Sequence, residues 1–168
     1  PIWLLGSSLF SAQLAAQQGL PYAFASHFAP RFLHQALALY RSLYQPSARW
    51  PRPYVAIGVP LIAAPTDDEA QWLASSTQQR VLGILTGQRG RLAPPVRGFM
   101  AQLPLQHRAA IDDFLATAII GGPDTVRAGL QALAEQTQAD ECLLVSDVYD
   151  PALRLRSLDI AAAVRTAA

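Results

Sequence analysis

Short apolar runs alternate with amphipathic segments along the chain, which is the pattern of strands separated by helices. Strands are predicted over Ile2–Leu5, Tyr22–Ser26, Tyr54–Ala63 and Glu141–Val145. Pro60 lies inside the third run, and we expect it near the end of that strand or at a bulge, because proline has no N–H to donate to a strand ladder. Four strands that alternate with helices imply parallel βαβ units and an α/β fold.

The segments between these runs predict helices over Ala12–Gln18, Pro30–Tyr44, 66–85, His107–Ala118, from Pro123 onward, and from Pro151 to about Arg165. Thr66 and Glu69 have the spacing of a capping box, in which each side chain bonds the backbone N–H of the other. Asp150 is expected to cap the last helix. We expect one partial domain over residues 1–168, with an irregular insertion near 75–108.

Composition narrows the class of protein. The chain has 168 residues, 51% of them apolar and 15% charged, with a formal net charge of +1. This balance gives no electrostatic case for binding nucleic acid or an anionic membrane. No apolar run approaches the roughly 18 residues that a membrane span needs. Cys142 is the single cysteine, so internal disulfides are excluded, and we expect it to pack as a small buried apolar residue. We expect no metal site in this chain and a cytoplasmic location for the protein.

A glycine and three serines lie between the first predicted strand and the first predicted helix: Gly6, Ser7, Ser8 and Ser11. A helix N-terminus presents unpaired N–H groups and a partial positive charge. Serine hydroxyls add further donors, so this cluster can cradle a phosphate without any basic residue. Gly6 would allow the backbone to approach closely. A plain serine N-cap is the alternative interpretation.

Several longer stretches carry a family resemblance. They are Ile2-Trp3-Leu4-Leu5-Gly6-Ser7-Ser8, Ala15-Ala16-Gln17-Gln18-Gly19-Leu20-Pro21, Phe24-Ala25-Ser26-His27-Phe28, Thr66-Asp67-Asp68-Glu69-Ala70, Gly121-Gly122-Pro123 and Ala139-Asp140-Glu141. Together they resemble the bacterial luciferase-like monooxygenase family, most densely over residues 2–30 and least over 75–108. Because that family folds as a (β/α)8 TIM barrel, the resemblance implies that the chain is the C-terminal half of the barrel, with strands five to eight.

The resemblance also implies a function. Family members are flavin-dependent oxidoreductases that use reduced FMN and molecular oxygen on small organic substrates, and many receive the flavin from a separate reductase. The serine pattern favours FMN over the deazaflavin F420, which some branches use. The family places Gly6, Ser7, Ser8 and Ser11 at the flavin phosphate, although luciferase has an acidic residue at the position of Ser7. His27 follows the second strand on the catalytic face of a barrel and could donate a hydrogen bond to flavin or substrate; a structural histidine is the alternative.

The length of the chain is short for a whole barrel, which needs about 250 residues or more, and the chain begins at Pro1 without a methionine. We therefore expect part of an enzyme that is inactive by itself. Its open sheet edges and apolar inner face would pair with the missing N-terminal half or with a second copy in a homodimer. The alternative is a non-catalytic half-barrel that self-associates or binds flavin without turnover.

Further polar residues lie near the expected catalytic face. Asp147 and Tyr149 follow the last strand, where loop packing is favoured over contact with substrate. Arg154 and Arg156 could reach an anion, but a solvated helix face is favoured over that role. A lid and a mobile surface loop are the two interpretations of the irregular segment that contains Arg89, Arg91 and Arg97.

Overall fold

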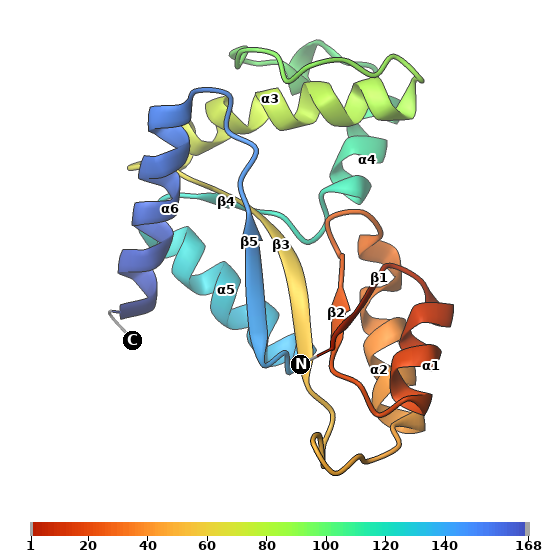
Figure 1. Cartoon of the computed structure of the whole chain (residues 1–168). Coiled ribbons are helices and arrows are strands. Elements are labelled where there is room, and N and C mark those ends of the chain that lie inside the picture. The colour runs from red at the N-terminus through yellow and green to blue at the C-terminus, as the bar shows by residue number, and fades with distance from the viewer. Residues whose placement is uncertain (1, 167–168) are drawn as a thin grey trace. The chain divides into compact units, whose positions relative to one another are not determined.

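The structure is a computed structural model that describes residues 2–166. Strands and helices alternate along the described residues (Figure 1). The elements are β1 (Leu4–Gly6), α1 (Leu9–Gln17), β2 (Tyr22–Phe24), α2 (Leu33–Leu43), β3 (Val55–Ala63), α3 (Asp67–Leu85), α4 (Leu105–Phe114), β4 (Ile119–Gly121), α5 (Pro123–Thr137), β5 (Glu141–Val145) and α6 (Pro151–Thr166), with 3-10 turns at Pro30–Phe32 and Met100–Gln102. The expected α/β class is confirmed.

The chain divides into two compact units. The first unit comprises Pro1–Val59 and Leu133–Leu144, and the second comprises Pro60–Ala132 and Val145–Ala168. Both units contain part of β3, because the division falls between Val59 and Pro60 within that strand.

Parallel strands form the centre of the first unit. Leu4 of β1 lies opposite Tyr22 of β2, and Tyr22 in turn lies opposite Val55 of β3. Helices α1 and α2 pack side by side next to these strands (Figure 1). Tyr22 of β2 and Tyr40 of α2 are both buried, and their ring centroids are 5.3 Å apart. The hydroxyl of Tyr40 donates to the carbonyl of Leu20 at 2.8 Å, and burial raises its pKa to about 12, so it remains a neutral donor.

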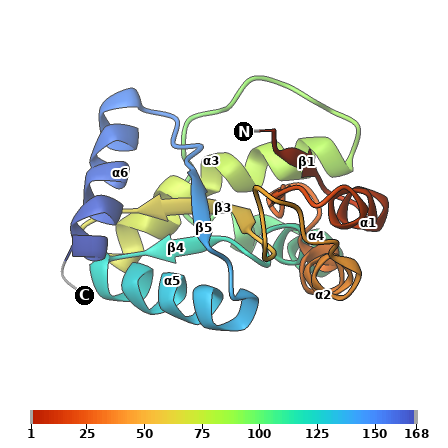
Figure 2. The same ribbon diagram turned by 60° about the horizontal axis from the view of Figure 1, so that its bottom comes forward.

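The second unit is built on the C-terminal part of β3. Leu61–Ala63 pairs in parallel with β4, and α5 runs alongside β4 (Figure 2). The backbone N–H of Ala63 donates to the hydroxyl of Ser157 at 2.8 Å, which ties α6 to β3 inside the core. The apolar cluster of this unit consists of Ile62, Ala64, Ala70, Leu73, Ala74 and Val148.

Two predictions about strands are corrected by the structure. Pro60 lies within β3 rather than at its end or at a bulge. Pairing with β2 reaches Ile57 and pairing with β4 begins at Leu61, so neither of these two ladders needs an N–H from Pro60. Strand β5 also pairs with β3. Strand β4 was not expected, because the preceding helix was predicted to extend to Ala118; that helix, α4, ends at Phe114 instead.

Two predictions about helix starts are also corrected. Helix α1 begins at Leu9 rather than Ala12, because Ser8 is the residue that caps it. At α3 only half of the expected capping box forms: the Thr66 hydroxyl accepts from the backbone N–H of Glu69 at 3.2 Å. The Glu69 carboxylate pairs with Arg156 instead of reaching back, because a charged partner binds a carboxylate more strongly than a neutral N–H does.

Candidate functional site

A closed set of hydrogen bonds between Ser8 and Ser11 begins α1. The Ser8 hydroxyl accepts from the backbone N–H of Ser11 at 3.2 Å, and the backbone N–H of Ser8 donates to the Ser11 hydroxyl at 3.3 Å. The Ser11 hydroxyl donates in turn to the carbonyl oxygen of Ser8 at 2.7 Å. These bonds form a capping box. The N-cap interpretation is therefore confirmed at Ser8, and Ser7 lies outside the box.

Two neighbours hold this capping box in place. The hydroxyl of Tyr22 shares a hydrogen bond of 2.9 Å with the Ser11 hydroxyl and donates to the Ser8 carbonyl at 3.3 Å. Burial raises the pKa of Tyr22 by more than the bond from Ser11 lowers it, so the phenol stays protonated. A Cβ atom at Gly6 would lie 2.2 Å from Oγ and 2.3 Å from Cβ of Ser11. Only glycine fits at this point.

The first turn of α1 keeps donors available to a ligand. The backbone N–H groups of Leu9 and Phe10 are at positions that have no partner within the helix. No acidic side chain lies in this turn, whereas the first turn of α3 carries Asp67, Asp68 and Glu69. The partial positive charge of a helix N-terminus attracts anions. The start of α1 is therefore suited to bind an anionic ligand, whereas the start of α3 already has carboxylates of its own chain beside it.

His27 lies at the same edge of the sheet as the serine cluster. The backbone N–H of Ala25 donates to the Gly6 carbonyl at 2.8 Å, so β1 and β2 end side by side. The imidazole of His27 packs over Gly58 of β3, where an added Cβ would lie 2.4 Å from Nδ1 and 2.9 Å from Cε1 of the ring. The missing side chain at position 58 therefore leaves the space that His27 occupies. Tyr22 and Gly58 were not singled out from the sequence.

Other charged candidates are engaged in packing within the second unit. Asp147 forms an ion pair with Arg80, as loop packing requires. The side chain of Arg154 donates to the carbonyl of Val148 at 2.8 Å, and Arg156 pairs with Glu69. Arg154 is exposed and the Arg156 side chain is 38% exposed, as expected of a solvated helix face, and each also links the start of α6 to a neighbouring segment.

The remaining candidates have no shared site. Cys142 in β5 is half-buried, and burial raises the pKa of its thiol. Arg97 lies over the indole ring of Trp72, 5.2 Å from its centroid. Exposed positions are taken by Arg89, Arg91 and Tyr149. Along residues 2–166, none of the helices combines the length and the apolar character needed to cross a membrane.

Comparison with known sequences gives one consistent family. The sequence profile described as luciferase-like monooxygenase matches residues 1–141. A protein of Escherichia coli K12 named "Luciferase-like monooxygenase" is 42% identical over 165 residues, and the uncharacterized protein YvbT of Bacillus subtilis 168 is 44% identical over 164. Each alignment covers 98% of this chain but 49% of the relative. The chain therefore spans about half the length of the curated relatives it matches.

Solved structures agree with this family in fold. The structure of apo-MsnO8 matches with a TM-score of 0.82 and 32% identity, over 98% of this chain and 50% of that one. The oxygenating constituent of 3,6-diketocamphane monooxygenase from Pseudomonas putida, solved in complex with FMN, matches with a TM-score of 0.61 and 21% identity, over 95% of this chain and 46% of that one. The expected half of a TIM barrel is thus confirmed.

Proposed function

Because the chain belongs to the luciferase-like monooxygenase family, we propose that it forms the phosphate-binding half of an enzyme that uses reduced FMN and molecular oxygen. The single observation that carries the proposal is the start of α1, which combines a serine N-cap, unpaired N–H groups and no acidic side chain. Bound FMN would supply the oxygen chemistry, and the residues of this chain would bind and orient it. The substrate is a small organic molecule.

The fit of a phosphate to this loop follows from its donors. The N–H groups of Leu9 and Phe10 and the exposed hydroxyl of Ser8 lie at one helix end, where the helix dipole favours negative charge. Ser7 adds a further hydroxyl at the end of β1 and, unlike an acidic residue, it does not repel a phosphate. Ser11 orients Ser8 through the capping box. Gly6 allows α1 to approach β1.

His27 is the second residue that we assign to the site. It lies in the turn after β2, at the same sheet edge as Gly6, and is positioned by packing over Gly58. A histidine ring nitrogen there would donate a hydrogen bond to the flavin or to the substrate. A purely structural histidine would satisfy the same packing, so FMN affinity of His27→Phe separates the two roles: a loss of affinity with unchanged stability supports ligand contact.

The choice of cofactor rests on the serine pattern, in which Ser8 and Ser11 favour FMN over F420. Among proteins of similar fold, one was solved with FMN, and another is an F420-dependent tetrahydromethanopterin reductase from Methanopyrus kandleri with 13% identity. Parallel titrations with FMN and F420 test this choice directly, and tighter binding of F420 would overturn it.

Exposed apolar residues support a partner for the sheet. Leu5 of β1 is 71% exposed and Leu143 of β5 is 51% exposed, although both lie within strands of the first unit. Apolar strand residues of this kind are normally covered. We propose that the N-terminal half of the barrel or a second copy covers them, and that a separate reductase supplies the reduced flavin.

The decisive experiment compares FMN with riboflavin, which lacks the phosphate, in titrations of the full-length protein. We expect FMN to bind at least about 10-fold more tightly, because charge-assisted hydrogen bonds contribute about 1.5–3 kcal/mol each. The double variant Ser8→Ala and Ser11→Ala should lose this preference.

Thr66→Ala is the matched control, because it removes the N-cap of α3 at a similar cost in stability, about 1 kcal/mol, without touching the loop. Its preference for FMN should be unchanged. An unaltered preference in the double serine variant would refute the phosphate assignment.

A further inference from the structure

A cleft of about 330 Å³ lies wholly within the second unit, between α3 and the segment 96–101. Figure 1 shows the irregular segment that follows α3 running back along this helix, on the side away from β4. The helix contributes Asp68, Gln71, Trp72, Ser75 and Gln78 to the cleft. These positions recur at intervals of three and four residues and so form one stripe of the helix. The volume is within the range of small-molecule sites, about 300–1,000 Å³.

Hydrogen bonds fasten the irregular segment to this stripe. The backbone N–H of Val96 donates to the Ser75 hydroxyl at 2.7 Å, and that hydroxyl donates to the Trp72 carbonyl at 2.6 Å. The side-chain amide of Gln79 donates to the carbonyl of Pro94 at 2.9 Å. The wall opposite α3 is therefore anchored at two successive points, and the cleft is a fixed feature of this unit.

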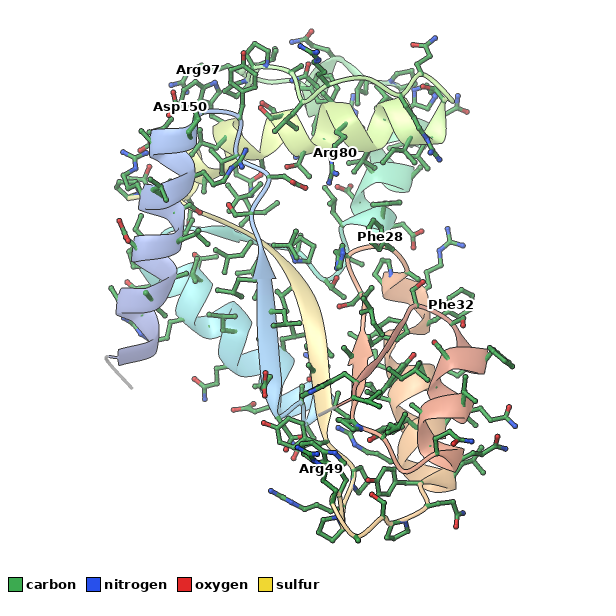
Figure 3. All side chains as sticks on the ribbon, viewed as in Figure 1. Phe28, Phe32, Arg49, Arg80, Arg97 and Asp150 are labelled. Atoms are coloured by element: carbon green, nitrogen blue, oxygen red, sulfur yellow. The ribbon has the colours of Figure 1, made fainter. Side chains whose placement is uncertain are left out.

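Two polar side chains in the cleft have unused hydrogen-bonding groups. Gln78 is only 8% exposed, and its side-chain amide has no hydrogen-bond partner among the residues that the structure describes. An amide carries both donors and an acceptor, so Gln78 can bond to a ligand in the cleft through either group. The Cζ atom of Arg97 lies over the Trp72 ring, 5.2 Å from its centroid, and Figure 3 labels Arg97 on the irregular segment beside α3. Within the described part of the chain, none of its N–H groups meets an acceptor.

These groups define the chemistry of a ligand. The contact with Trp72 holds the Arg97 guanidinium beside the cleft, and its N–H groups can donate the two parallel hydrogen bonds that a carboxylate accepts. Val96, Phe99 and Met100 supply apolar surface beside it. Asp68 also lines the cleft and opposes a second negative charge. We infer that the cleft binds a small monocarboxylate with an apolar body. This ligand site shares no residue with the proposed flavin site.

Calorimetric titration of the full-length protein with benzoate tests this inference, with benzamide as its neutral counterpart and phthalate as the dianion. We expect benzoate to bind at least about 10-fold more tightly than benzamide, because the charged pair with Arg97 is lost in the amide. Phthalate should bind more weakly than benzoate because of Asp68. FMN should leave the affinity for benzoate unchanged, so failure here and failure of the flavin proposal are distinguishable.

The variants Arg97→Gln and Gln78→Leu locate the binding. Arg97→Gln should remove the preference for benzoate over benzamide, and Gln78→Leu should weaken both ligands. Arg91→Gln is the matched control, because Arg91 is exposed on the same irregular segment and does not line the cleft. Arg97 is also exposed, so its variant is expected to fold even where Gln78→Leu does not. Absence of benzoate binding at millimolar concentration, or equal binding by Arg97→Gln, would overturn the inference.

Discussion

Replacing Gly6 with alanine tests whether close packing between β1 and α1 holds the serine loop. The added Cβ would lie 2.2 Å from Oγ and 2.3 Å from Cβ of Ser11. Rotation of the Ser11 side chain can move Oγ away but cannot move Cβ, which is fixed by the backbone. Either the end of β1 or the first turn of α1 therefore has to shift.

The cost of this shift has two parts. Overpacking of this kind destabilises a protein by about 1–3 kcal/mol. The shift also stretches the bonds from the Ser11 hydroxyl to the Ser8 carbonyl, now 2.7 Å, and to the Tyr22 hydroxyl, now 2.9 Å. Each such bond contributes about 0.5–1.5 kcal/mol. We therefore expect Gly6→Ala to lower the free energy of unfolding by about 2–6 kcal/mol.

Urea unfolding followed by circular dichroism measures this loss. Gly90→Ala is the control, because no atom lies within 4 Å of its added Cβ, and it should change stability by no more than about 1 kcal/mol. In a Ser11→Gly background, which lacks the clashing Cβ, Gly6→Ala should cost clearly less than in the wild type. An effect as small as that of Gly90→Ala, or the same cost in both backgrounds, would refute the packing argument.

Two substitutions probe the second unit. Ser157→Ala leaves the buried N–H of Ala63 without its acceptor and should cost about 1–3 kcal/mol in urea unfolding, whereas the exposed Ser42→Ala should cost within about 0.5 kcal/mol; equal losses would contradict this. The N–H of Gly122 donates to Asp67 at 2.6 Å and holds the pKa of that carboxyl below its ordinary value of 3.8. The resulting stability is fully present above about pH 4 and is lost as the pH falls through the lowered pKa, so Asp67→Asn should flatten the acid limb of a stability profile; an unchanged limb would argue against the role of Asp67.

Elements with strong local signals could be predicted from the sequence. Strand β5 begins and ends as expected, and α6 starts after Asp150, whose carboxylate accepts from the N–H groups of Ala152 and Leu153 at 2.8 and 3.0 Å. Strand β4 could not be predicted in the same way. Its three residues are extended because Leu61–Ala63 pairs with them, and this partner is more than fifty positions earlier in the chain.

In the candidate site, too, features that depend on local sequence could be predicted and features that depend on long-range contacts could not. The serine cluster could be identified because an N-cap depends on neighbours within three residues, although the expected start at Ala12 did not select Ser8 as the cap. The contacts that position the site are long-range: Tyr22 bonds to Ser11 across eleven positions, and Gly58 gives space to His27 across thirty-one. Such contacts leave no local pattern, because an ordinary core tyrosine and an ordinary strand glycine have the same sequence surroundings.

The two interpretations of the serine cluster, an N-cap and a phosphate site, turn out to share one geometry. The capping box satisfies the N–H of Ser11 and fixes the loop, while the N–H groups of Leu9 and Phe10 keep no partner within the helix. A loop that is fixed before an anion arrives loses little freedom on binding. Hydrogen bonds within the loop therefore cannot separate the two interpretations. The absence of acidic side chains from this turn favours an anion, and the preference for FMN over riboflavin is the measurement that depends on the phosphate alone.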